Sequence, residues 1–190
     1  VGTQKDTSAK AAEFTEKYNG VYATVGLHPI HTEKSFHDPE EIGGSEGFTS
    51  RGEEFDCEFY RKLALKPKVV AIGECGLDYF RLKLKVESCK LEAPNFEEEG
   101  LKQKEVFVKH IKLASEVKKP LMIHCREAFP DLIKILGENR KTLLPERPGI
   151  VHFFSGTTEE TRDLLDLGFF FTFGGVITFV RDYDKVIKII

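Results

Sequence analysis

Residues 69–79 read VVAIGECGLDY, an apolar run that leads into Glu74. The apolar residues are continuous rather than alternating, which is typical of a strand covered on both faces, as in a parallel sheet. Gly73 and Gly76 flank the glutamate, and glycine lets a backbone approach a ligand closely. We therefore expect a buried strand with a carboxylate at its end that bridges divalent cations. The alternative is a glutamate that pairs with an arginine or caps a helix.

Two later segments repeat this pattern with histidine in place of glutamate. Residues 120–127 read PLMIHCRE and residues 149–156 read GIVHFFSG, so His124 and His152 each end an apolar run. They lie 28 residues apart, about one strand-and-helix repeat, so they are expected to project from neighbouring strands towards a shared point. A single histidine at a strand end is more often structural. Two at equivalent positions, together with the glutamate, favour a metal site.

The rest of the chain alternates between apolar runs and amphipathic stretches, which predicts strand–helix–strand units on a parallel sheet. Helices are predicted over residues 101–117 and 128–136 from apolar residues three and four apart. Thr157 and Glu160 have the spacing of a capping box that opens a third helix, and Gly168 is placed to end it. The predicted strands are residues 21–25, 69–72, 121–123, 150–151 and 169–173.

Two segments interrupt this alternation. Residues 33–56 are rich in Gly, Ser and acidic residues, and residues 81–100 mix lysines with a run of three glutamates. Both are predicted to be surface loop insertions.

The composition fits one globular domain. The chain has 190 residues, 41% of them hydrophobic and 16 of them Phe, which is enough for a sizeable core. A formal net charge of -3 disfavours a protein that coats nucleic acid non-specifically, so a polyanionic substrate needs local cations. The four cysteines form no C-x-x-C pair and no apolar run has the length of a membrane span. We expect free thiols and a location in the cytoplasm, the nucleus or both.

Two further polar residues follow the predicted strands. Arg126 lies two residues after the first histidine, where a guanidinium can hold a phosphate oxygen in a bidentate fashion. Its alternative role is an ion pair with Glu127 or Asp131. Asp78 either orients a histidine beside the metal or caps the following turn.

The remaining histidines divide into one candidate and three structural residues. His28 comes directly after a predicted strand and before a proline, so substrate contact and loop packing are both open. His37 lies in the first insertion, His31 lies two residues before that insertion, and His110 lies on a helix face. We expect these three to be structural.

Together these motifs resemble the TatD-type metal-dependent deoxyribonucleases, barrel hydrolases related to the amidohydrolases. The resemblance spans nearly the whole chain and keeps the order of the family's motifs. It implies an α/β fold, a TIM-type (β/α)8 barrel of the metallo-dependent hydrolase type, with residues 1–190 forming a single incomplete barrel domain. The motifs are VGT at residues 1–3, VGLHP at 25–29, AIGECGLDY at 71–79, Gln103 with Phe107, IHCREA at 123–128, HFFSG at 152–156 and GGVITF at 174–179.

The resemblance also implies the chemistry. Glu74 would bridge two divalent ions (Mg, Mn or Zn), with His124 and His152 completing one centre, and His28 and Arg126 would contact the substrate phosphate. The reaction would be hydrolysis of a DNA phosphodiester, of the exodeoxyribonuclease kind. A water molecule whose pKa is lowered by the cations would attack phosphorus.

Two parts of the family pattern have no counterpart in the chain: a first strand ending in a His-x-His pair, and a late strand carrying an aspartate. Residues 1–3 match the tip of the family's second strand, and residue 190 falls before the eighth. We expect the sequence to be a fragment of a longer protein whose unclosed sheet has edges that invite association. The isolated fragment should bind metal weakly and have little activity.

Two other functions stay open. A related amidohydrolase or lactonase would keep the barrel and the metals but cleave a different bond. Such enzymes often use a carboxylated lysine as the bridging ligand, whereas this chain has a glutamate there. A catalytically incomplete chain with a structural or interaction role is the other alternative.

Overall fold

The computed structural model describes residues 1–37, 48–88, 96–180 and 183–190. A parallel sheet of five strands, in the order β1-β4-β5-β6-β7, forms its centre. Strands that follow one another in this sheet are direct neighbours, so the sheet advances in one direction, as in a TIM-type barrel and unlike a doubly wound sheet. The fold is α/β, an incomplete TIM-type barrel. The strands are β1 (Ala23–Val25), β4 (Val69–Asp78), β5 (Leu121–Arg126), β6 (Gly149–His152) and β7 (Phe170–Phe171).

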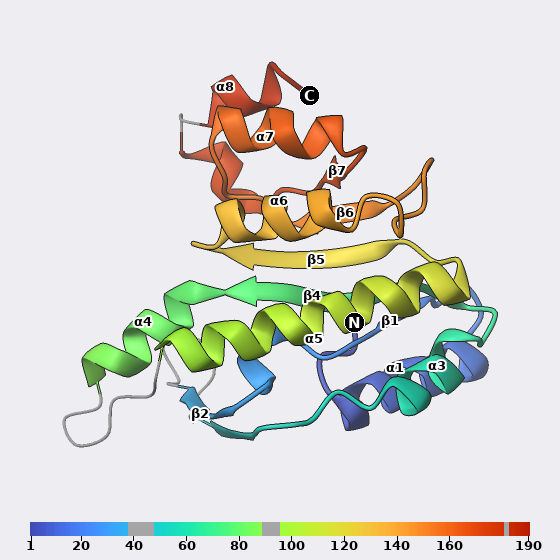
Figure 1. Ribbon diagram of the computed structural model, residues 1–190. Coiled ribbons are helices and arrows are strands. Elements are labelled where there is room, and N and C mark those ends of the chain that lie inside the picture. The colour runs from blue at the N-terminus through green and yellow to red at the C-terminus, as the bar shows by residue number, and fades with distance from the viewer. Residues whose placement is uncertain (38–47, 89–95, 181–182) are drawn as a thin grey trace.

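Helices connect and cover these strands (Figure 1). Figure 1 shows the long helix α5 running beside β4, with α6 beside β5 and α7 beyond it. A short 3₁₀ turn, η1, follows β1, and another, η2, follows β7. The helices are α1 (Lys5–Lys17), α3 (Cys57–Ala64), α4 (Tyr79–Ser88), α5 (Phe96–Val117), α6 (Phe129–Glu138), α7 (Thr158–Asp166) and α8 (Tyr183–Ile187), and the turns are η1 (Pro29–His31) and η2 (Gly175–Thr178).

All five predicted strands are present, with different ends. The main difference is β4, which continues through Glu74 to Asp78 instead of ending at Ile72. Its residues pair with the whole of β5 and are buried from Ala71 onward, except for the half-buried glutamate. The polar end of the motif is therefore part of the strand.

The predicted helix faces are confirmed. In α5 the buried residues include Val106, Phe107 and Ile111, which form the predicted apolar face. At the start of α7, Thr157 N donates to Glu160 Oε2 at 2.7 Å and Glu160 N donates to Thr157 Oγ1 at 3.2 Å, which completes the capping box.

The prediction of a surface loop over residues 81–100 is wrong for the part that the structure describes. Residues 81–88 belong to α4, whose Leu82 is buried, and residues 96–100 form the first turns of α5. The three consecutive glutamates lie in the first turn of α5, where negative charge is favourable because the helix dipole is positive there. Residues 89–95 lie outside the described residues.

The first interrupting segment is also not all loop. Strands β2 (Lys34–His37) and β3 (Phe48–Arg51) form an antiparallel pair apart from the main sheet, and residues 38–47 lie outside the described residues. Helices α1 and α3 were not predicted. No helix in the described parts of the chain combines the length and the apolar character needed to cross a membrane.

Candidate functional site

The pairing of β4 with β5 brings two predicted site residues together. Gly76 is the register partner of His124, and Asp78 is the partner of Arg126. Glu74 lies on β4 two residues before Gly76. Its Oε1 is 3.3 Å from His124 Nδ1. Both side chains lie in the carboxyl-terminal halves of their strands, towards the catalytic end of TIM-type barrels.

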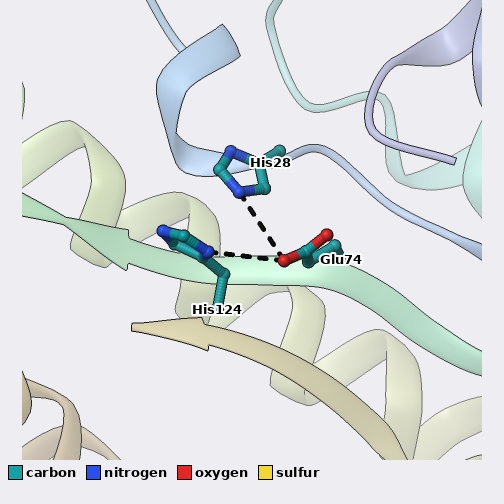
Figure 2. Close-up of side chains that lie close together, drawn as sticks. All are labelled: His28, Glu74 and His124. Atoms are coloured by element: carbon teal, nitrogen blue, oxygen red, sulfur yellow. Dashed lines mark ion pairs between the residues drawn. The ribbon is translucent and has the colours of Figure 1, made fainter. Parts of the chain in front are cut away.

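A third side chain enters this cluster from the loop after β1. His28 stands at the N-terminal end of η1, and its Nε2 is 3.8 Å from the same Oε1 of Glu74 (Figure 2). The rings of His28 and His124 are 4.3 Å apart between centroids. One ligand atom from each of the three residues lies within 4.8 Å of the other two. Two imidazole nitrogens and a carboxylate oxygen at this spacing fit a divalent cation such as Zn²⁺ or Mn²⁺.

Asp78 lies behind His124 on the side away from Glu74. Its Oδ2 is 3.0 Å from His124 Nε2, and its Oδ1 accepts a hydrogen bond from Arg81 N at 2.9 Å. Asp78 thus makes the contacts of both roles considered for it, one with a histidine and one with the following turn, while its role in orienting a metal ligand stays a prediction. Gln103 holds its backbone, because Gln103 Oε1 accepts from Asp78 N at 2.9 Å.

The two carboxylates determine the charge of His124. Burial of the ring opposes the charged form, but hydrogen bonds with Asp78 and Glu74 outweigh it and raise the pKa of His124 to about 9. At neutral pH the ring therefore carries a proton when no cation is present. That proton must leave before a ring nitrogen can bind a metal.

His28 is held with one preferred tautomer. Its Nδ1 accepts a hydrogen bond from Ile30 N at 3.3 Å, so in the neutral ring the proton is on Nε2. This nitrogen faces Glu74. A protonated nitrogen donates a hydrogen bond and has no lone pair for a metal. The geometry therefore suits His28 better as a hydrogen-bond donor than as a ligand.

Backbone contacts fix the loop that carries His28. His28 N donates to Thr3 O at 2.9 Å, and Glu74 N donates to Gly2 O at 3.2 Å. Residues 1–3 form no strand, although they were expected to be a strand tip. Instead, this segment links the backbones of the two site residues.

Helix α5 supports the same loop through His110. The buried ring accepts a hydrogen bond from Leu27 N at its Nε2, 3.0 Å, and its Nδ1 lies 2.8 Å from Val106 O. Burial lowers the pKa of His110 to about 4, against a smaller opposing effect of the bond to Val106. His110 is structural, as predicted. His31 is buried with its ring centroid 6.1 Å from that of His28, and its structural role stays a prediction. The side chain of His37 lies outside the described part of the structure.

The glycines beside Glu74 have a structural role that was not predicted. A Cβ atom on Gly73 would lie 2.3 Å from Met122 O, and one on Gly76 would lie 2.0 Å from His124 O. Their φ angles of 152° and 138° are rarely adopted by other residues. The glycines are required because β5 approaches closely.

His152 lies on the neighbouring strand but outside the cluster. It is the register partner of His124, as expected from the spacing of the two histidines. Its Nδ1 is 3.0 Å from Thr172 Oγ1, and among the described residues it does not belong to the group of three. Its role as a metal ligand stays a prediction. Thr172 was not predicted as a site residue, and its only signal was that it is the one polar residue within the predicted strand 169–173.

Arg126 is exposed at the end of β5. Its guanidinium carbon lies 3.6 Å from the centroid of the Phe80 ring, a stacked cation–π arrangement. The ion pairs considered for it do not form, because Glu127 pairs with Lys83 at 2.6 Å and Asp131 pairs with Lys104 at 2.7 Å. No ion pair of Arg126 is found in the described part of the chain, which leaves its N–H groups able to hold an anion.

Comparisons with known proteins point to one family. The family model described as TatD related DNase matches residues 1–190. Over 179 residues the chain is 34% identical to the "Uncharacterized metal-dependent hydrolase YabD" of Bacillus subtilis, which covers 94% of the chain and 57% of that relative. Over 170 residues it is 30% identical to the "3'-5' ssDNA/RNA exonuclease TatD" of Cronobacter sakazakii, which covers 89% of the chain and 51% of that protein.

A solved structure agrees with these matches. The crystal structure of YJJV, a TatD homolog from Escherichia coli, superimposes with a TM-score of 0.68 at 26% identity, covering 95% of the chain and 57% of that protein. The chain thus spans about half to three fifths of the length of the relatives it matches.

Proposed function

Because the chain belongs to the TatD related DNase family of metal-dependent hydrolases, we propose that it hydrolyses phosphodiester bonds of DNA from an end, with two divalent cations held at the carboxyl ends of β4, β5 and β6. The observation that carries the proposal is the position of Glu74 between His28 and His124, with Asp78 behind the second histidine. The name of the Cronobacter sakazakii relative supports a nucleic acid as the substrate.

In this proposal Glu74 bridges the cations, and His124 and His152 complete one centre. Asp78 holds the His124 ring with its Nδ1 turned towards Glu74, the arrangement in which an outer carboxylate orients a metal-binding histidine. When bound, divalent cations would polarise the phosphoryl group and lower the pKa of the attacking water. Thr172 holds the His152 ring through Nδ1 and leaves Nε2 for the cation.

Two residues are assigned to the substrate. His28 presents the Nε2 proton of its neutral ring at the edge of the cluster, where it can donate to a phosphate oxygen. Arg126 is exposed beside the cluster and can hold a second oxygen of the same phosphate. Arg126 supplies local positive charge, which a chain of net charge -3 needs to bind a polyanion, and His28 supplies a neutral hydrogen-bond donor.

The test is hydrolysis of single-stranded and duplex DNA, with Mg²⁺, Mn²⁺ or Zn²⁺, by the purified full-length protein of which the 190 residues are expected to be a fragment. We expect Glu74→Gln to lower kcat at least about 100-fold, because removing a group that stabilises charge in the transition state costs roughly this much. Glu13→Gln, on the exposed face of α1, is the matched control and should keep full activity. Undiminished hydrolysis by Glu74→Gln, or no hydrolysis with any of the metals, would contradict the proposal.

The same preparations separate phosphodiesterase from amidohydrolase or lactonase activity. Phosphodiester, amide and lactone substrates are compared side by side with each metal. Since the bridging position is occupied by Glu74 and not by lysine, we expect activity on the phosphodiester alone.

A further inference from the structure

Phe153, the residue directly after His152, is an aromatic side chain placed at the tip of β6 and left open to solvent. It is 58% exposed, although it lies within a motif whose next residue, Phe154, is buried in the core. Its ring meets the His152 ring edge to face, with 4.6 Å between centroids and an interplanar angle of 87°. Single exposed apolar side chains are common on protein surfaces, so the backbone and the contacts of Phe153, and not its exposure, set it apart.

The backbone holds Phe153 in an unfavourable conformation. Its φ angle is 49°, in the left-handed region that residues with a Cβ rarely adopt. Such conformations persist where the surroundings impose them, and they concentrate at functional sites. Here the constraint is a hydrogen bond from Phe153 N to Thr172 Oγ1 at 3.2 Å, the same oxygen that lies 3.0 Å from His152 Nδ1. Thr172 therefore fixes the histidine and the phenylalanine together.

The ring rests on a glycine. A Cβ atom on Gly174 would lie 2.1 Å from Phe153 Cε1, so any other residue there would displace the ring. The edge of His152 on one side and the bare backbone of Gly174 on another give the ring a defined place. A side chain that is both seated and exposed can serve as a stacking surface without losing much conformational freedom on binding.

A cation stacked on an aromatic ring lies at the tip of the adjacent strand, β5. Arg126 follows His124 by two residues and covers the ring of Phe80, while Phe153 follows His152 by one, and the two histidines are register partners. Aromatic rings interleaved with cations along one edge are the usual means of binding single-stranded nucleic acid, because every base has a π-face and every phosphate a charge.

We propose that Phe153 stacks on an unpaired base of the nucleic-acid substrate next to the scissile phosphate. This proposal rests on the function proposed above. It adds to that function that one residue, Phe153, selects single-stranded over duplex ends. A base held in a duplex has both faces covered by its neighbours, so only a base that has left the stack can use the ring.

The first experiment measures stacking without catalysis. A short oligothymidylate that carries one terminal 2-aminopurine is titrated with protein in EDTA, and the quenching of its fluorescence is followed. We expect quenching by the wild type and by Phe153→Trp, and roughly tenfold weaker binding with little quenching for Phe153→Ala, in line with the effect of removing one stacked ring. Phe170→Ala is the matched control, since Phe170 is 59% exposed on β7 but does not follow a site histidine.

The second experiment measures catalysis on the same variants. Phe153→Ala should raise KM for single-stranded DNA roughly tenfold and leave KM for an end that lacks its terminal base unchanged. If the wild type hydrolyses DNA but Phe153→Ala matches it in quenching and KM, the stacking role is wrong and the proposed function stands. If no DNA is hydrolysed but quenching is lost in Phe153→Ala, the stacking role stands and the proposed function is wrong. A wild type that does not quench the probe overturns the inference.

Discussion

At the scale of single residues, His124 lies between two carboxylates, whose negative charges favour a positive charge on the ring. Glu74 faces its Nδ1 at 3.3 Å and Asp78 faces its Nε2 at 3.0 Å. Without a cation the ring itself supplies that charge, which is why its pKa rises to about 9. A divalent cation beside Glu74 would replace the proton, so the same arrangement that protonates the ring also prepares it for metal.

The first prediction concerns Asp78→Asn. Asparagine keeps an oxygen that can accept from Arg81 N, so the start of α4 should be preserved and Tm should change little. The charge that orients His124 is lost, and we expect affinity for Zn²⁺ or Mn²⁺ to fall about 10- to 100-fold. Metal titration followed by calorimetry measures this, with Asp163→Asn on the exposed face of α7 as the control. Equal metal affinity in the two variants would contradict the assigned role.

The second prediction concerns His110 and pH. The pKa of its ring is about 4 in the folded protein against 6.5 for the free side chain, so between these values the unfolded chain binds a proton that the folded chain does not. Its contribution to stability is therefore complete above pH 6.5 and is lost as the pH falls towards 4. The loss is about 3 kcal/mol, from the size of the pKa change.

A comparison with His110→Gln isolates this contribution, because the other titrating groups are common to both proteins. Urea unfolding at a series of pH values should show the stability difference between wild type and variant shrinking by about 3 kcal/mol from neutral pH to pH 4. A difference that does not depend on pH would show that His110 titrates normally.

Much of the candidate site could be predicted from single residues, and the reason is positional. Glu74 and His124 each end an apolar run, and parallel strands place their ends at one edge. What could not be predicted are side-chain contacts over long sequence distances. Examples are the bond between Thr172 and His152, and the support of Leu27 N by His110 from α5. The close approach of β5 to Gly73 and Gly76 was missed for the same reason, since it is not encoded locally.

At the scale of elements, polar residues decide where helices begin and where they are anchored. The run of glutamates in the first turn of α5 resembles a solvated loop in sequence but stabilises the helix N-terminus in the structure. Lys119, between the end of α5 and the start of β5, provides an anchor. Its Nζ donates to Ala64 O at the end of α3, to Lys66 O at 3.1 Å and to Val69 O at the start of β4. Burial lowers the pKa of Lys119.

The third prediction follows from this anchor. Lys119→Met keeps the length of the side chain but leaves three carbonyl groups without their donor. We expect the free energy of unfolding to fall by about 2 to 3 kcal/mol, as for the loss of hydrogen bonds to a charged group. Chemical denaturation measures it, and Lys112→Met, on the exposed face of α5, is the control and should change stability by less than about 0.5 kcal/mol. Equal stability of both variants would show that the carbonyls find other partners.

At the scale of the whole molecule, the order of the sheet follows from the alternation of strands and helices, but its closure does not. Within the five-stranded sheet every strand pairs with the next strand of that sheet along the chain. The separate β2–β3 pair lies between β1 and β4 in the sequence. Five strands are too few to close a barrel of the TIM type, so within the described residues β1 and β7 are each paired on one side only. The strands were predicted because each is a continuous apolar run. Their ends were not, because pairing with the neighbour sets them.

The last prediction concerns the open side of β7. Phe170 is 59% exposed on this outermost strand, and an exposed apolar edge is a template for pairing with a second chain. We expect the 190-residue chain to associate as its concentration rises, and Phe170→Lys to reduce that association, because a charged side chain on an edge strand opposes pairing. Sedimentation velocity over a range of concentrations measures it. Phe14→Lys, at a 40% exposed position on α1, is the control and should associate like the wild type. Sedimentation that is independent of concentration in all three proteins would show that this edge is already protected.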